Sequence, residues 1–371
     1  MKILVTGALG FIGKNLIAEL KNRGYEDIYK VDVDTSLNDL VSYCNDCEFV
    51  FHLAGVNRPQ NEDEFMEGNF GFTSTLLNAL KEAGNKAPIL ITSSVQAKLD
   101  NPYGKSKKAG EDLMFEYGKS LGVPVYVYRL TNVFGKWSRP NYNSAVATFC
   151  NNIAAGLPIK VNDPSVVMKL IYIDDVVEEF IAALNGKANI VEGFGTVPVE
   201  HKVELGRIAE LIYSFKESRD NLTLPDFSNG FEKKLYSTYL SFLPKDKFAY
   251  SLSKKSDDRG SFTEFIRTDN KGQVSINVAK PGITKGNHWH HTKNEKFLVV
   301  SGEALISFRK IGETEIIEYR VNGEELKVLD IPCGYVHNIK NIGEEDLVTV
   351  MWCNEAFDPK KPDTYYEPVY V

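Results

Sequence analysis

The stretch that decides the fold is "KILVTGALGFIGKNLIAELKNRG", residues 2–24. It opens with a short apolar run typical of a buried parallel strand, and "FIGKNLIAELKNRG" then has the pattern of a helix that ends at Gly24. Gly7, Gly10 and Gly13 give the turn between them GxxGxxG spacing. In such a turn glycine lets the backbone approach a pyrophosphate, which the free N–H groups of the helix N-terminus bind. The stretch therefore predicts the first strand, turn and helix of a nucleotide-binding sheet.

An acidic residue follows at the distance that this kind of turn requires. Asp32 ends "IYKVD", about 20 residues after the glycines, where a carboxylate binds the ribose hydroxyls of adenosine. Asp34 is the alternative candidate for binding the ribose; otherwise it is an ordinary solvated turn residue. Further buried-strand candidates alternate with helix-like stretches, which predicts an α/β fold with a doubly wound parallel sheet. These strand candidates are "DIYKVDVD", "CEFVFHLAG", "APILITSS" and "VPVYVYRLT".

The bulk composition excludes several classes of protein. The net charge is −7 without a basic block, which argues against nucleic acid as a partner. No apolar run reaches the ~18–20 residues of a membrane span, and the first residues lack the layout of a secretory signal, so a cytoplasmic protein is expected. Cys44 and Cys47 have CxxC spacing, but five scattered cysteines predict reduced packing residues rather than a disulfide framework.

The texture of the sequence changes once. Helical segments are predicted around 141–156, 174–186 and 203–219. After about residue 245 the chain consists of short alternating segments such as "QVSINVAK", "EALISFRK" and "DLVTVMWC", separated by Gly, Pro and Asn. No helix pattern remains there, so a β-sandwich or barrel is predicted. At 371 residues two domains are expected, and we place them at 1–247 and 248–371.

A candidate proton donor lies in "NPYGKSKKAG". Tyr103 and Lys107 are four residues apart, so a helix would place both on one face. An ammonium nearby favours tyrosinate and lowers the pKa of the phenol, which can then exchange a proton with an alkoxide. Ser94 of "TSS" precedes this pair and could hydrogen-bond the same carbonyl oxygen.

Residues 1 to about 245 resemble the extended short-chain dehydrogenases/reductases, the group of nucleotide-sugar epimerases, dehydratases and reductases. The resemblance rests on "TGALGFIG", "VFHLAG", "ITSS", "YGKSK", "RLTNVFG" and "YIDDVV". It implies a Rossmann-like sheet, catalysis by Ser94, Tyr103 and Lys107, and Asn132 facing the sugar. The segment "VQAKLDN" before Tyr103 is short and lacks the group's "VYG", which leaves the detail of the substrate pocket open. Asp32 would conventionally favour NAD, so NADH is possible, but related sugar reductases use NADPH and we expect NADPH. The residues implied to bind the cofactor are Gly7, Gly10, Phe11, Ile12, Gly13, Asp32, Leu53, Ala54, Tyr103 and Lys107.

A second group of candidate functional residues lies in "GITKGNHWHHTKNEKFLVVSG", residues 282–302. His288 and His290 are two apart, so on a strand both point to the same side. Glu295 and the distant His337 could complete a site for a divalent ion, most simply Zn²⁺, with one position left open. The plainer reading is a cluster of surface histidines. His291 is one residue out of phase with the ligands and is expected to face outward or to support the residues around them.

This region resembles the cupins, small jelly-roll β-barrels with two such motifs, although Leu326 stands where the second motif has a glycine. The preceding "DDRGSFTEF" resembles the segment that leads into the barrel in cupin epimerases acting on nucleotide-linked 4-keto-6-deoxy sugars. That resemblance implies substrate contacts for Arg259 and Glu264, with Phe262 packing nearby. In those epimerases the residue matching His288 is a base and no metal is bound. Because all four ligand positions are filled here, we interpret His288 as a ligand first and a base second.

The two parts together resemble a family of bifunctional capsule-biosynthesis enzymes. The resemblance implies that the cupin domain epimerises C3 of a UDP-2-acetamido-2,6-dideoxy-4-hexulose. The reductase domain then reduces the C4 ketone with NADPH to UDP-N-acetyl-6-deoxy-L-talosamine, on the route to UDP-N-acetyl-L-fucosamine. It also implies a homodimer. The alternative is an NAD-dependent epimerase or dehydratase whose cupin domain only senses sugar or dimerises.

Overall fold

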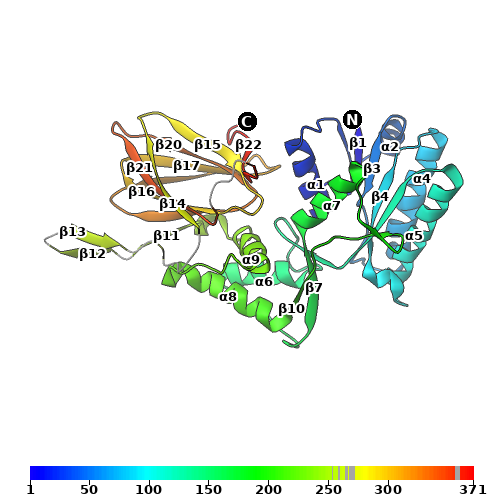
Figure 1. Cartoon of the computed structure of the whole chain (residues 1–371), viewed down its shortest axis with the longest axis horizontal. Helices are drawn as coiled ribbons and strands as arrows, with labels where there is room; N and C mark the ends of the chain where they lie inside the picture. The colour runs from blue at the N-terminus through cyan, green and yellow to red at the C-terminus, as the bar shows by residue number, and fades with distance from the viewer. Residues whose placement is uncertain (253, 258–259, 264–265, 267–271, 356–359) are drawn as a thin grey trace. The chain divides into compact units, whose positions relative to one another are not determined.

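The computed structural model describes the chain except for residues 253, 258–259, 264–265, 267–271 and 356–359 (Figure 1). The described chain forms two compact units. The first comprises Met1–Ser144 and Val167–Val203, and the second comprises Ala145–Val166 and Glu204–Val371. Within the described residues, every helix is too short or too polar to cross a bilayer.

A seven-stranded sheet in the order β2-β1-β3-β4-β5-β9-β8 forms the centre of the first unit. Strands β1 to β5 are parallel neighbours, as the alternating pattern predicted, and only β8 and β9 at one edge pair in antiparallel. A smaller sheet has the order β10-β7-β6. The strands are β1 (Ile3–Thr6), β2 (Ile28–Val31), β3 (Phe49–His52), β4 (Ile89–Ser94), β5 (Val125–Leu130), β6 (Asn132–Phe134), β7 (Val167–Tyr172), β8 (Ile190–Val191), β9 (Phe194–Gly195) and β10 (His201–Glu204).

Helices cover both faces of this sheet. Val50 on β3 belongs to a core with Leu76 of α4 and Met114 of α5, whereas its neighbour Phe51 stacks on Phe180 of α7. Because successive strand residues point to opposite faces, α4 and α5 cover one face and α7 covers the other. The predicted doubly wound α/β fold is confirmed. Its helices are α1 (Phe11–Asn22), α2 (Leu37–Cys44), α3 (Asp63–Phe65), the π-helix η1 (Met66–Gly71), α4 (Phe72–Glu82), η2 (Val95–Lys98), α5 (Pro102–Leu121) and α7 (Ile173–Leu184).

Cys44 and Cys47 both lie in this core and are free. Burial raises the pKa of the Cys44 thiol to about 11 and that of Cys47 to about 12. A thiol with a raised pKa is a poor nucleophile and metal ligand. The packing role that the sequence predicted for the CxxC pair is confirmed.

The second unit begins with helices. Helix α9 lies outside the three predicted helical segments, and Asn229 caps it by accepting hydrogen bonds from the N–H groups of Phe231 and Glu232. Arg219 of α8 lies 3.3 Å from the Asp330 carboxylate in the barrel, and Lys296 pairs with the same carboxylate. These helices therefore pack with the barrel; the division at residue 247 stays a prediction. The helices are α6 (Ala145–Ala155), α8 (Leu205–Asn221), α9 (Gly230–Leu240) and η3 (Lys245–Lys247).

Strands make up the rest of the second unit. They form two antiparallel five-stranded sheets, in the orders β11-β19-β16-β21-β14 and β18-β17-β20-β15-β22, and a two-stranded antiparallel sheet of β12 and β13. The buried side chains of Trp289, Phe308 and Trp352 are among those that fill the unit. The predicted all-β cupin is confirmed. The strands are β11 (Ala249–Ser251), β12 (Lys254–Asp257), β13 (Gly260–Thr263), β14 (Gln273–Ala279), β15 (Thr284–Trp289), β16 (Glu295–Ser301), β17 (Glu303–Lys310), β18 (Ile316–Asn322), β19 (Lys327–Ile331), β20 (Tyr335–Asn341), β21 (Leu347–Cys353) and β22 (Tyr365–Tyr366).

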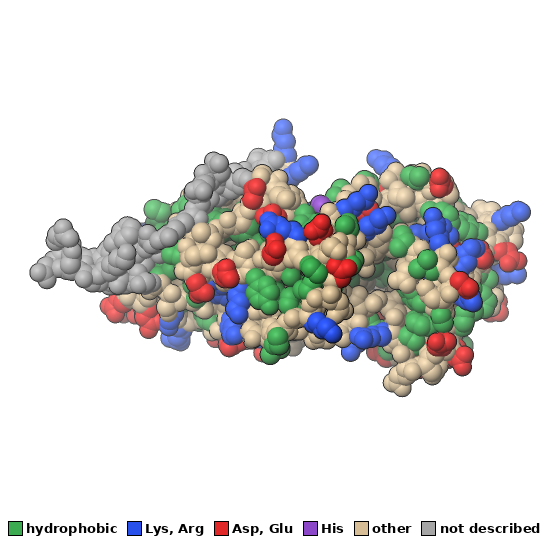
Figure 2. All heavy atoms as spheres, turned by 90° about the horizontal axis from the view of Figure 1, so that it is seen from below, with side chains coloured by type: hydrophobic (Ala, Val, Ile, Leu, Met, Phe, Trp, Pro, Cys, Tyr) green, Lys and Arg blue, Asp and Glu red, His purple; other side chains and the backbone are tan. Residues whose placement is uncertain are grey.

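Charges of both signs are mixed on the surface. Figure 2 shows Lys and Arg side chains interspersed with Asp and Glu over the face that it draws. This mixture agrees with a chain whose 43 basic and 50 acidic residues nearly balance.

Candidate functional site

The glycine turn is closed by backbone contacts that exclude side chains. Gly7 has φ 66°, and a Cβ there would lie 2.8 Å from the backbone nitrogen of Ala54. A Cβ on Gly13 would lie 2.2 Å from the carbonyl oxygen of Gly7. Gly10 is the N-cap of α1 and brings no side chain to its first N–H groups. This arrangement is compatible with a phosphate at the helix N-terminus, and the binding role of the turn remains a prediction.

Asp32 lies beside this turn. It directly follows β2, and its carboxylate accepts a hydrogen bond from the backbone N–H of Leu9 at 2.7 Å. Leu53 and Ala54, which follow β3, are bound to Thr6 at the end of β1 through their backbone N–H groups. Phe11 and Ile12 begin α1 and are half-buried. The residues predicted to bind a dinucleotide thus gather at the carboxyl ends of neighbouring parallel strands, where open α/β sheets bind ligands.

Ser94, Tyr103 and Lys107 come together at the same end of the sheet. Ser94 ends β4, and Tyr103 and Lys107 lie one turn apart on α5. The hydroxyl of Ser94 hydrogen-bonds Tyr103, and Lys107 Nζ lies 5.9 Å from the centre of the Tyr103 ring. Lys107 Nζ also donates to the carbonyl oxygen of Thr92 at 3.4 Å. A phenol, a hydroxyl and an ammonium group, which general acid catalysis on a carbonyl would require, therefore lie near one another here.

The pKa of Tyr103 differs from the expectation. Burial raises it above the ordinary value for tyrosine, and the hydrogen bond with Ser94 only partly opposes this. Lys107 is buried as well, and burial lowers the pKa of its ammonium from 10.5 to about 8. The expected lowering of the phenol pKa by Lys107 is therefore wrong, because burial disfavours both charged forms.

Asn69 is a polar residue of this site that the sequence reasoning missed. It lies on the π-helix η1, buried, and its amide donates to the hydroxyl of Ser106 at 3.0 Å. Its amide oxygen accepts from the N–H of Val56 at 2.9 Å. A Cβ on Gly55 would lie 2.8 Å from both Asn69 Oδ1 and Lys107 Nζ, so the amide and the ammonium approach the same point. The π-helix, a form often found at functional sites, has no simple sequence pattern.

The four predicted metal ligands form one group. His288 is on β15, His290 directly follows that strand, Glu295 begins β16 and His337 is on β20. Their ligand atoms all lie within 4.8 Å of one another. Glu295 Oε2 is 3.4 Å from His290 Nε2 and 3.3 Å from His337 Nε2. The strands thus bring the four side chains together around a single point.

The chemistry of this group fits a divalent metal ion. His290 Nε2, His337 Nε2 and Glu295 Oε2 are buried, and none has a well-aligned hydrogen-bond partner in the described part of the chain. Buried polar atoms are costly unless bound, so a ligand that satisfies all of them at once is indicated. Burial, then the neighbouring His337 and His290, lowers the pKa of His288 to about 3. Burial alone would raise the pKa of Glu295, but contacts with His290 and His337 keep it well below its usual value. Neutral imidazoles and a carboxylate are the protonation states that bind Zn²⁺.

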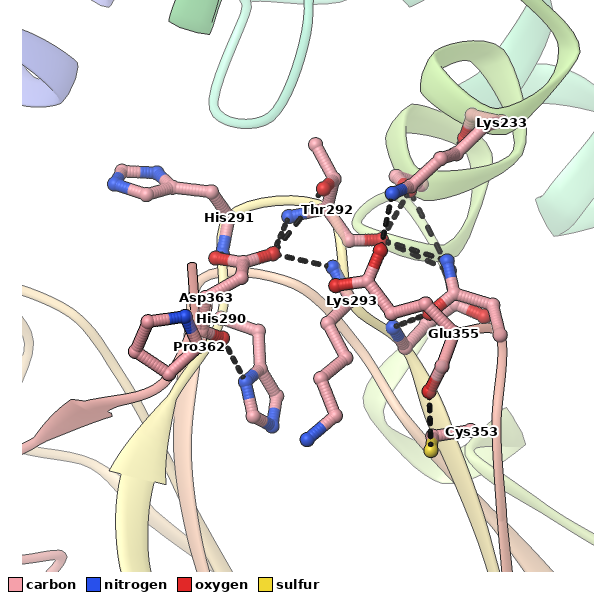
Figure 3. A network of polar contacts seen from close by, with 12 residues as sticks. Lys233, His290, His291, Thr292, Lys293, Cys353, Glu355, Pro362 and Asp363 are labelled. Carbon is pink, nitrogen blue, oxygen red and sulfur yellow. Dashed lines mark hydrogen bonds and ion pairs between the residues drawn. The ribbon is translucent and has the colours of Figure 1, made fainter. Parts of the chain in front are cut away.

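Lys293 is a further residue here that the sequence reasoning missed. Its side chain is nearly buried, and Nζ lies 3.4 Å from Glu295 Oε1. Figure 3 shows its chain extending alongside His290. His291, in contrast, turns to the rings of Trp289 and Tyr365 and is not one of the four grouped ligands, as expected. Leu326 has φ 51°, so leucine takes the left-handed conformation for which the motif usually has glycine.

Comparison with known proteins agrees with both halves. Residues 3–193 match the NAD dependent epimerase/dehydratase family, and residues 255–365 match the polysaccharide biosynthesis C-terminal domain. The chain belongs to the NAD dependent epimerase/dehydratase family. A family member from Pseudomonas aeruginosa, UDP-2-acetamido-2,6-beta-L-arabino-hexul-4-ose reductase, is 46% identical over 365 residues, which are 98% of each chain.

Solved structures show the same relationship. The capsular polysaccharide assembling protein CapF from Staphylococcus aureus has 53% sequence identity and a TM-score of 0.70, over 99% of this chain and 100% of that one. A UDP-glucuronic acid 4-epimerase from Bacillus cereus covers 58% of this chain and 83% of its own, with a TM-score of 0.51 and 23% identity, and supports the fold alone. As a member of the epimerase/dehydratase family, the chain is an NAD(P)-dependent enzyme.

The residues predicted to bind substrate are only partly described. Asn132 is exposed on β6, and its amide donates to the carbonyl oxygen of Lys169 at 3.1 Å. Arg259 and Glu264 lie outside the described residues. Phe262 is described only by its backbone, on β13. The contacts expected of these residues remain predictions.

Proposed function

We propose that the chain catalyses two successive steps on a UDP-2-acetamido-2,6-dideoxy-4-hexulose. The second unit inverts C3, and the first unit then reduces the C4 ketone with NADPH to give UDP-N-acetyl-6-deoxy-L-talosamine. One observation carries this proposal: the Tyr103 constellation and the His288–His290–Glu295–His337 group occur in one chain that matches a named UDP-hexulose reductase over 98% of its length. The product belongs to capsule biosynthesis, in keeping with the similarity to the capsular polysaccharide assembling protein CapF.

In the reduction, bound NADPH would supply the hydride that C4 accepts. The Tyr103 hydroxyl gives its proton to the oxygen of the same carbonyl group, and Ser94 donates a hydrogen bond to that oxygen. The Lys107 ammonium stabilises the tyrosinate left behind until solvent returns a proton. The oxygen thus receives its proton as the charge on it develops, and the ketone becomes a secondary alcohol.

In the epimerisation, His288, His290, Glu295 and His337 would hold a divalent ion, which we propose is Zn²⁺. Bound there, it would polarise the C4 carbonyl and make the hydrogen on C3 more acidic. Lys293, beside Glu295, places a further cation where negative charge on the substrate would develop. Reduction removes the carbonyl that makes C3 acidic, so epimerisation has to come first.

The test uses the whole chain with the 4-keto sugar in D₂O. Without NADPH, deuterium should enter the sugar at C3; with NADPH, the talosamine derivative should form and one NADPH should be consumed per product. If NADPH is consumed but no deuterium enters the sugar at C3, the barrel does not epimerise the sugar and serves only for sensing or dimerisation. Turnover without net NADPH consumption would instead indicate an epimerase or dehydratase that regenerates its cofactor.

Three further parts of the proposal concern cofactor choice, location and assembly. NADPH is proposed over NADH as in related sugar reductases, despite Asp32. The free cysteines are consistent with a reducing, cytoplasmic location.

A homodimer is supported by β14, an edge strand whose Val274, Ile276 and Val278 are 58%, 69% and 48% exposed. Exposed apolar edge strands pair readily with another chain, and sedimentation of a Val274→Lys/Ile276→Lys variant tests this.

A further inference from the structure

The turn between β15 and β16 carries part of the proposed metal centre. It runs from His290 to Asn294, with one ligand at its start, the buried Lys293 within it and Glu295 directly after it. A chain reversal at this point leaves several backbone N–H groups without partners in the sheet. The group that accepts hydrogen bonds from these N–H groups also determines where the side chains of His290 and Lys293 point.

A single carboxylate from far along the chain binds these N–H groups. Asp363 Oδ1 accepts from the backbone N–H of His291 at 2.9 Å, although the two residues are 72 positions apart. Asp363 Oδ2 accepts from the backbone N–H groups of Thr292 at 2.9 Å and Lys293 at 2.7 Å, and from the Thr292 hydroxyl at 3.1 Å. Figure 3 shows the carboxylate facing the turn. Three successive N–H groups that converge on one anion give a rigid arrangement.

The backbone of Asp363 acts directly on a metal ligand. Its carbonyl oxygen lies 2.6 Å from His290 Nδ1. A carbonyl oxygen only accepts, so Nδ1 carries a proton, and in the neutral imidazole that binds a metal ion Nε2 then keeps its lone pair. That Nε2 is the buried atom 3.4 Å from Glu295 Oε2. One residue therefore sets both the path of the turn and the tautomer that a metal ion requires.

The position of Asp363 is itself well determined. It precedes β22, whose Tyr365 and Tyr366 pair with Trp289 and His288 on β15. Its φ of 34° lies in the left-handed region, which is uncommon for residues other than glycine. Such a conformation persists where surrounding contacts over-determine it, and it clusters at functional sites.

We propose that Asp363 is the positioning residue of the metal centre, holding His290 in its ligating tautomer and Lys293 beside Glu295. This inference rests on the metal-dependent epimerisation proposed above. The turn has independent support from the N–H of Gly334, which donates to the carbonyl oxygen of His290, and from Asn354, which pairs with Asn294. Loss of the Asp363 carboxylate should therefore misdirect the ligand rather than unfold the barrel.

The test compares Asp363→Asn and Asp363→Ala with Glu367→Gln in the full chain. Glu367 is a carboxylate of the same C-terminal segment, but its side chain pairs with Arg309 and not with the turn. Zinc affinity is measured by competition with a chromophoric chelator, and the His290 tautomer by ¹⁵N NMR of the metal-free protein. Thermal unfolding of the metal-free variants reports the fold.

Asp363→Ala should weaken zinc binding by roughly 10- to 100-fold, and Asp363→Asn by less, while Glu367→Gln binds as the wild type does. Asp363→Ala keeps the backbone carbonyl that accepts from His290 Nδ1, but without the carboxylate the turn should shift away from it, so the His290 signals should lose the single Nδ1–H tautomer. Unchanged affinity and tautomer in a folded Asp363→Ala, or equal weakening by Glu367→Gln, would overturn the inference. If Asp363→Ala does not fold, Asp363→Asn decides by the same two readouts. Wild-type protein that binds no zinc would instead overturn the proposed metal centre itself.

Discussion

His288 and His337 are directly opposite each other on β15 and β20, with ring centroids 4.6 Å apart. Burial is the largest cause that lowers the pKa of each ring, and together with the neighbouring His337 and His290 it brings that of His288 to about 3. Two neutral imidazoles therefore face each other near neutral pH, with the Glu295 carboxylate beside them. Folding has already removed these groups from water, so an ion can bind between them without further desolvation of its ligands.

Replacing Glu295 with Gln should remove zinc binding, because the amide keeps the size of the side chain but loses its charge. We expect affinity to fall by more than roughly 100-fold, beyond what the loss of a supporting hydrogen bond costs. Zinc content after dialysis against a chelator measures this, and deuterium exchange at C3 should stop. Glu303→Gln, an exposed glutamate on β17, is the control and should retain its zinc.

Tyr103→Phe should reduce C4 reduction by at least roughly 100-fold, since general acid catalysis contributes about 10²–10⁴ to such rates. Deuterium exchange at C3 should continue, because that step does not use the phenol. NADPH oxidation and mass spectrometry of the sugar measure the two steps separately. Tyr213→Phe, on the exposed side of α8, serves as the control. Substantial reduction by Tyr103→Phe would mean that another group donates the proton.

The rate of reduction should decline as the pH rises through about 8. Burial lowers the pKa of Lys107 to about 8, so above this pH the cation that stabilises the tyrosinate is lost. Because the folded pKa lies below the ordinary 10.5, the unfolded chain binds more protons between these values, and stability should increase with pH there. Activity and stability thus change in opposite directions. In Lys107→Met neither the reduction rate nor the stability should change with pH in this range. If rate and stability of the wild type both rose with pH, the role assigned to Lys107 would be contradicted.

Gly13→Ala should destabilise the glycine turn. Its Cβ would lie 2.2 Å from the Gly7 carbonyl oxygen, so the backbone has to move. Overpacking of this kind costs about 1–3 kcal/mol in the free energy of unfolding, and NADPH binding should weaken with it. Chemical denaturation and cofactor fluorescence measure the two effects. Gly230→Ala has no heavy atom within 4 Å of the added Cβ and should behave as the wild type does.

Asp330→Asn should destabilise the second unit strongly. Asp330 is buried with Lys296 and Arg219 as its cationic partners, and the substitution leaves the buried Lys296 and the partly buried Arg219 without this counter-charge. Removing one partner from a buried ion pair costs about 3–5 kcal/mol. Asp346→Asn, which breaks the exposed pair with Lys280, should cost less than about 1 kcal/mol. Equal unfolding midpoints for the two variants would contradict the importance of the buried cluster.

The sequence predicted those features that depend on short-range patterns. Gly7, Gly13 and Asp32 were found because a strand, a turn and a helix follow one another in the chain. His288 and His290 were found because alternate strand residues share a side. Tyr103 and Lys107 were found because one helical turn separates them.

The features that were missed depend on contacts between distant segments. Asp363 has no local signal, since its partners lie 70 to 73 positions earlier. Asn69 lies on a π-helix, which has no simple periodicity. Helix α9 is an exception, because its apolar residues do recur at helical spacing after the cap at Asn229. The raised pKa of Tyr103 depends on burial, which spacing alone does not give.

The Asp330 cluster also limits how this enzyme could be recombined. Arg219 is on α8, whereas Lys296 and Asp330 belong to the strands of the barrel. A barrel transplanted onto another enzyme without α8 would keep the Asp330–Lys296 pair but lose the Arg219 guanidinium that lies against the second oxygen of the Asp330 carboxylate. Chimeras that exchange the barrel should therefore keep α8 with it, so the transferable segment begins well before the first barrel strand.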